Sequence, residues 1–115
     1  MLGFSFYVVR QETADRTQPA AFDTSQGRIV ANWVSFVYGE EKLTALLPPD
    51  SIIALGGDGY PSRMTARAGE LLPALRRGGA PDPKRGGDDR VTFYEVVAAD
   101  CDDNEWLIIE MWDQS

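Results

Sequence analysis

Residues Trp106 to Trp112 leave fewer structural choices than any other segment of the chain. Their side chains alternate with the two-residue period of a β-strand, and large apolar groups fall on both faces. Leu107, Ile109 and Met111 lie on one face, and Trp106, Ile108 and Trp112 lie on the other. Because neither face of such a strand is wholly solvated in a monomer, we expect one face in the core and a second face that a dimer or another partner helps to cover.

The same alternation predicts two more strands. Arg90 to Ala98 forms one, and the polar turn Asp100 to Asn104 would join it to the Trp106 strand in a β-hairpin. Leu2 to Arg10 forms the other, at the N-terminal end of the chain. The sequence therefore predicts a small antiparallel sheet made of the N-terminal strand and the C-terminal hairpin.

A first helix is expected between Ser25 and Leu47, where apolar residues recur at helical spacings. Arg28 to Tyr38 is rich in β-branched and aromatic residues, however, and also fits a buried strand. The choice between helix and strand for residues 28–38 therefore stays open at this stage.

A second helix is predicted to begin at a cap formed by Ser62 or Thr65 and to end before Gly78. Pro73 lies inside it and predicts a kink or a break. The expected fold class is α+β, with the small sheet covered by two or three helices. At 115 residues the chain fits one domain, with a flexible loop at 11–24 and a linker at 78–89.

The amino-acid composition argues against several kinds of catalytic and metal-binding site. The chain has no histidine, so the commonest general base and the commonest metal ligand are missing. Its single cysteine, Cys101, cannot form an internal disulfide, and no apolar run reaches the roughly 18 residues of a membrane span. We expect a cytoplasmic, non-catalytic protein without a cofactor or metal.

Charge is distributed unevenly along the chain. The net charge is −7, yet residues 1–90 hold 11 acidic and 11 basic residues, so residues 91–115 carry the whole imbalance with seven acids and no base. Such a surface attracts a basic partner and repels nucleic acid. The alternative is that the acids keep a sheet edge soluble and are neutralised within the chain.

The leading hypothesis is a protein-binding module of the immunity or inhibitor type, which docks the acidic hairpin on a basic protein. A homodimer through the hairpin is a further possibility. The residues expected to contact the partner are Glu95, Asp102, Asp103, Glu105, Trp106, Glu110 and Trp112.

Two other segments carry groups that could bind a small ligand. The turn from Asp100 to Glu105 has carboxylates suited to calcium or magnesium, but it lacks the spacing of an EF-hand, and a solvated turn is the better interpretation. The glycine-rich loop from Gly56 to Thr65 precedes the predicted second helix, which suggests an alternative function as a small ligand-binding or enzymatic domain. The residues expected to hold an anionic group there are Gly57, Gly59, Arg63 and Arg67.

One stretch of the sequence resembles a known family. Residues Asn32 to Arg77, with the segments WVSFV, IIALGG and GYPSRMT, are similar to the YfbM-like family of uncharacterised bacterial proteins. This resemblance covers under half of the chain and implies an α+β cytoplasmic bacterial protein with no catalytic residues to transfer. In size, acidity and single-domain character the chain also looks like proteins that neutralise bacterial toxins.

Overall fold

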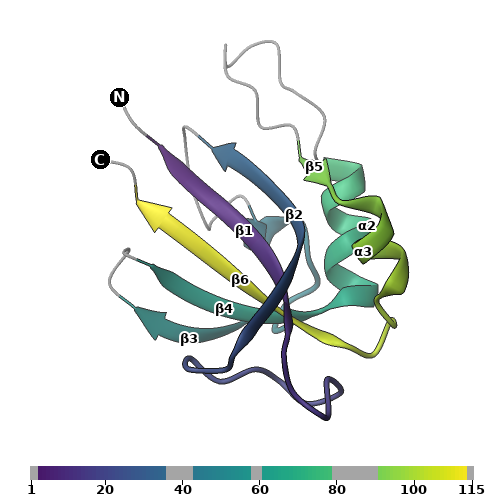
Figure 1. Cartoon of the computed structure of the whole chain (residues 1–115). Helices are drawn as coiled ribbons and strands as arrows, with labels where there is room; N and C mark the ends of the chain where they lie inside the picture. The colour runs from purple at the N-terminus through teal and green to yellow at the C-terminus, as the bar shows by residue number, and fades with distance from the viewer. Residues whose placement is uncertain (1–2, 36–42, 58–60, 79–90, 114–115) are drawn as a thin grey trace.

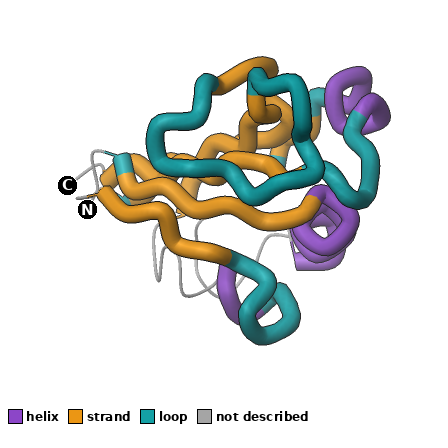
Figure 2. Tube along the Cα trace, turned by 90° about the horizontal axis from the view of Figure 1, so that it is seen from below, coloured by secondary structure: helices purple, strands orange, loops and turns teal. Residues whose placement is uncertain are grey.

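The computed structural model describes residues 3–35, 43–57, 61–78 and 91–113. Its main feature is one antiparallel sheet of six strands in the order β3-β4-β6-β1-β2-β5, strongly bent along its length (Figure 1). The strands are β1 (Phe4–Gln11), β2 (Gln26–Ser35), β3 (Ile53–Gly57), β4 (Ser62–Arg67), β5 (Thr92–Phe93) and β6 (Trp106–Asp113). The helices α2 (Ala68–Gly78) and α3 (Glu95–Asp100) lie close to each other on one side of the bent layer (Figure 2).

The expected α+β fold, a small sheet covered by two or three helices, is therefore wrong. Sheet dominates the described residues, and the helices α2 and α3 are only 11 and 6 residues long. The predicted strand Leu2 to Arg10 is confirmed as β1, and the predicted strand Trp106 to Trp112 is confirmed as β6. What differs is the structure between them.

The predicted C-terminal hairpin does not form. Thr92 and Phe93 are the only described residues of its first strand that form a strand, and they pair with β2 rather than with β6. Residues 95–100 are helical, and Val97 and Ala98 are buried next to each other. Burial of two consecutive residues on one helix face outweighs the β-propensity of the valines, because tertiary packing overrides weak local preference. The strand β6 instead lies between β4 and β1.

The helix predicted from Ser25 to Leu47 is also wrong over its first part, since residues 26–35 form β2. The alternative interpretation of residues 28–38 as a strand is therefore confirmed for residues 28–35. Residues 36–38 lie outside the described residues. Pairing with β1 places Trp33 opposite Phe6, and the two rings stack with centroids 4.7 Å apart. Aromatic stacking across the two strands thus favours the extended conformation of this segment, for which the sequence left helix and strand both open.

The second helix begins later than predicted. Ser62 and Thr65 belong to β4, and α2 starts at Ala68. Its first N–H groups instead donate to backbone carbonyls of the loop before β6. The Ala68 N–H donates to the carbonyl of Glu105 at 2.7 Å, and the Gly69 N–H donates to the carbonyl of Asp103 at 3.0 Å. The acidic loop therefore satisfies a helix N-terminus, where negative charge is favourable.

Pro73 does not break α2, which continues to Gly78. The N–H that proline lacks would have bonded to the carbonyl of Gly69, in the first turn, so only one hydrogen bond is lost. Leu71 and Leu75 on the same helix face are fully buried and hold the helix against the sheet.

The loop at 101–105 approaches α2 so closely that only glycine fits at position 69. A Cβ added there would lie 2.8 Å from the Cβ of Asp103 and 2.9 Å from its carbonyl oxygen. We expect Gly69→Ala to destabilise the protein by about 1–3 kcal/mol, although alanine is the better helix former. A thermal melt checks this: an unchanged or higher Tm would mean that the contact with Asp103 is not tight.

The two faces of the sheet are covered differently. The main core lies on the face with Phe6, Val8, Leu107 and Ile109, which α2 and α3 cover. On the opposite face, Val9, Ala20 and Ile108 form a smaller cluster with Leu55 packed against it. The expected apolar character of both faces of the Trp106 strand is thus explained by two separate clusters.

A loop lies across part of the second face. We call residues 12–25 the strap. The Gln11 amide donates to the carbonyls of Gln18 and Trp106, both at 2.9 Å, and the Ala20 N–H donates to the Thr65 hydroxyl at 3.3 Å. These bonds hold the strap over one half of the face and leave the other half to solvent. The flexibility expected for residues 11–24 stays a prediction, and the linker expected at 78–89 lies outside the described residues apart from Gly78, which ends α2.

Candidate functional site

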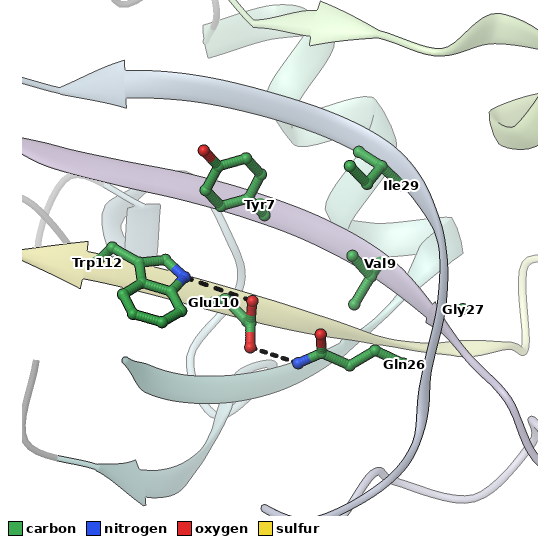
Figure 3. Close-up of a pocket in the computed structure, with 7 residues that line it drawn as sticks. All are labelled: Tyr7, Val9, Gln26, Gly27, Ile29, Glu110 and Trp112. Carbon is green, nitrogen blue, oxygen red and sulfur yellow. Dashed lines mark hydrogen bonds between the residues drawn. The ribbon is translucent and has the colours of Figure 1, made fainter. Parts of the chain in front are cut away.

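The uncovered half of the second face contains a hollow of about 420 Å³ (Figure 3). We call this part of the sheet the open face. Three strands contribute to it: Tyr7 and Val9 from β1, Gln26, Gly27 and Ile29 from β2, and Glu110 and Trp112 from β6. Strand alternation and register bring them together, because Tyr7 pairs with Glu110 and Val9 pairs with Ile29.

A nearly buried carboxylate lies in this hollow. Glu110 is 7% exposed, and its Oε2 accepts hydrogen bonds from the Gln26 amide and from Arg63 Nε, the latter at 2.9 Å. Its Oε1 accepts from the indole N–H of Trp112 at the long distance of 3.4 Å (Figure 3). A buried carboxylate needs such partners, since burying an unpaired charge is strongly unfavourable. Within the described ranges, both stronger donors bind the same oxygen, Oε2.

Apolar and aromatic groups surround the carboxylate and extend beyond the hollow. Ile29 is 38% exposed, and Tyr7 and Trp112 are half-buried. A second hollow of about 290 Å³ adjoins the first through Tyr7 and is lined in part by Asn32 and Val34. Val34 is also an exposed large hydrophobic residue, so an apolar side chain borders the second hollow as well.

The residues predicted to contact a partner do not form one surface. Glu110 and Trp112 lie together in the open face. Trp106 lies on the same sheet face but is buried, with the guanidinium of Arg67 5.1 Å from its ring centre. Asp102 and Asp103 are exposed in the loop that caps α2.

The two remaining predicted contact residues are glutamates that pair with arginines. Glu95 is exposed on α3, where Arg76 donates to both of its carboxylate oxygens at 2.6 and 3.2 Å. Glu105 is only 3% exposed, and Arg10 donates to both of its oxygens at 2.7 and 2.8 Å. Part of the C-terminal acidity is therefore neutralised within the chain, as the alternative to partner recognition expected.

Burial and pairing oppose each other at Glu105. Burial of its carboxyl raises the pKa, but hydrogen bonds from Arg10 and the arginine charge lower it more, so the pKa lies below its usual range. Next to this pair, burial and the Glu105 charge raise the pKa of the Cys101 thiol to about 11. The thiol is therefore protonated at neutral pH, which disfavours a nucleophilic role.

The alternative anion site loses its structural basis. Gly57 ends β3 with φ of +118°, Arg63 and Arg67 lie on β4, and Gly59 is outside the described residues. The glycine loop thus lies between two paired strands and does not precede a helix N-terminus. Arg63 is already bonded to Glu110 and, at 2.7 Å, to the carbonyl of Phe22.

Two further observations concern metals and membranes. In the part of the chain that the structure describes, no three acidic or cysteine side chains gather as a metal site would require, and Glu105 turns toward Arg10. None of the helices in the described ranges has the length and apolar character needed to cross a bilayer.

Tyr7 and Ile29 were not among the predicted contact residues. A sequence signal existed for Tyr7, which falls on the second face of the first strand, but only the strand register brings it next to Glu110. Comparison with known proteins gave no match to a family model, a curated protein or a solved structure. The candidate site therefore rests on its geometry alone.

Proposed function

We propose that this chain is a non-catalytic protein-binding module and that the open face is its docking surface. The observation that carries this proposal is the set of exposed or half-buried apolar side chains, Ile29, Tyr7 and Trp112, around a nearly buried carboxylate. Protein interfaces combine such a core of aromatic and aliphatic groups with a few polar groups that fix the register. A wide, shallow surface suits a protein better than it suits a small molecule.

The finer proposal is an immunity or inhibitor protein with a basic partner, acting in the cytoplasm. A net charge of −7 favours encounter with a basic protein and makes its association rate sensitive to salt. The C-terminal acids contribute to that field, although the hairpin they were expected to form does not exist. The resemblance of residues 32–77 to the YfbM-like family agrees with a bacterial origin and stays a proposal.

A single charge among the apolar side chains of the open face tests the docking surface. We expect Ile29→Glu to reduce capture of the partner at least about tenfold, because the interface would bury an unpaired carboxylate. Val96, which is 77% exposed on α3, provides the matched control: Val96→Glu introduces the same group away from the open face. The measurement is quantitative affinity capture from a lysate of the organism that produces the chain.

Capture by the wild-type chain and by Val96→Glu, but not by Ile29→Glu, supports the proposal. Equal capture by all three proteins would mean that the partner docks elsewhere. If the chain recovers only itself, sizing of wild type and Ile29→Glu decides whether the open face joins two copies. That outcome would replace the basic partner by a second copy of this chain.

A further inference from the structure

The hollow in the open face has one hydrogen-bond acceptor that the chain uses weakly. Both close donors to Glu110, from Gln26 and Arg63, bind Oε2. Among the residues that the structure describes, the donor to Oε1 is the Trp112 indole alone, at 3.4 Å, which is the outer limit of a hydrogen bond. Since a carboxylate oxygen accepts two bonds, Oε1 has capacity for a stronger donor that enters from the hollow.

The surroundings of this oxygen select the kind of donor. Tyr7 and Trp112 present aromatic rings and Val9 and Ile29 present aliphatic groups, so the entering group must tolerate an apolar wall. A guanidinium is planar, stacks on aromatic rings and is more weakly hydrated than an ammonium. It also donates charge-assisted hydrogen bonds, which are stronger than bonds between neutral groups.

We propose that the open face receives an arginine side chain of the partner, with its guanidinium donating to Glu110 Oε1 beside Tyr7 and Trp112. This inference rests on the proposed function and adds the chemistry of the contact. The bound arrangement places Glu110 between two guanidinium groups, its own Arg63 and that of the partner. Arg63 therefore weakens the attraction for the guest as well as stabilising the carboxylate.

A short peptide tests the contact without knowledge of the partner. The probe is acetyl-Gly-Arg-Gly-amide, and its neutral counterpart contains citrulline, which has nearly the same shape and no charge. Titration is followed by the indole N–H resonance of Trp112 in a two-dimensional nitrogen–proton spectrum, identified by its loss in Trp112→Phe. We expect a saturable shift with the arginine peptide and at least about fivefold weaker binding of the citrulline peptide.

Two variants change the carboxylate environment in opposite directions. Glu110→Gln removes the charge and is expected to weaken binding of the arginine peptide about tenfold. Arg63→Gln removes the competing internal cation and is expected to strengthen binding several-fold, since a like charge next to the guest is lost. Opposite signs separate a direct contact from a general loss of structure, which would weaken binding in both variants.

Several results would overturn the arginine contact: no saturable shift at Trp112, equal binding of the citrulline peptide, or equally tight binding of a third peptide with lysine in place of arginine. If Ile29→Glu abolishes capture of the partner while the arginine peptide fails to bind, the open face docks its partner by apolar contact and the proposed function stands. If capture is unaffected by Ile29→Glu, the proposed function fails as well.

Discussion

Replacing Glu105 with alanine is expected to lower the free energy of unfolding by about 3–5 kcal/mol. The change would leave Arg10, whose side chain is 14% exposed, without the carboxylate that it binds through two hydrogen bonds. Removing one partner of a largely buried pair costs more than the pair contributes, because the remaining charge stays partly desolvated and keeps only a weaker contact with the exposed Asp100 carboxylate at 3.7 Å. Urea denaturation of both proteins measures the difference.

The exposed pair between Arg76 and Glu95 provides the control. Glu95→Ala removes a carboxylate with similar geometry, but water and salt screen that pair at the surface. We expect little or no change in its stability. If Glu105→Ala were as stable as Glu95→Ala, the pair that joins β1 to the loop before β6 would not contribute to the fold.

The same pair sets a dependence of stability on pH. The pKa of Glu105 is lower in the folded chain than in the unfolded chain, where it is roughly 4.3. The unfolded state therefore binds the proton more readily, so the stabilisation is complete above the unfolded pKa and is lost as pH falls through the folded pKa. Glu105→Ala should show a shallower loss of stability below about pH 4.3 than wild type.

Replacing Phe6 with alanine is expected to destabilise the protein by about 3–5 kcal/mol. Phe6 is completely buried on the central strand β1 and stacks on Trp33, so its removal leaves a cavity between β1 and β2. Phe22, which is exposed in the strap with Arg63 over its ring, is the matched control. Phe22→Ala should cost far less, and equal effects in denaturant would contradict the position of the core.

The two strands that sequence analysis identified correctly, β1 and β6, have apolar side chains that pack on both faces of the sheet. In β1, Phe6 and Val8 face the main core while Tyr7 and Val9 face the other way, and β6 repeats this pattern. Such a pattern fixes extended structure without knowledge of the neighbouring strands. The bounds of β1 and β6 were therefore predicted to within two residues.

The predicted hairpin failed because its evidence was local. Alternation over residues 90–98 and a polar turn indicate a hairpin, but the segment is held elsewhere: Phe93 pairs with Ala31 on β2, and Arg76 lies over the Phe93 ring at 4.1 Å. No signal in residues 90–98 identifies these distant contacts. The strand that pairs with β6 in place of the predicted hairpin partner is β4. Its sequence resembles the capped start of a helix, so the strand was not predicted.

The candidate site was half predictable for the same reason. Glu110 and Trp112 stand two residues apart on one strand, so they share a face whatever the fold is, and both were proposed as contact residues. Their neighbours Tyr7 and Ile29 depend on the register of β1 with β6 and on a bulge between β1 and β2. Charge counting was less informative, since Glu105 and Glu95 are paired within the chain.

The most direct test of the open face as a docking surface is hydroxyl-radical footprinting of the chain alone and in complex with its captured partner. Tyr7 and Trp112 react readily when accessible, and both line the hollow. We expect their oxidation rates to fall together in the complex, while Val96, which is 77% exposed on α3, keeps its rate. Unchanged oxidation of Tyr7 and Trp112 with protection at Val96 would contradict the account and place the partner on the helical side of the molecule.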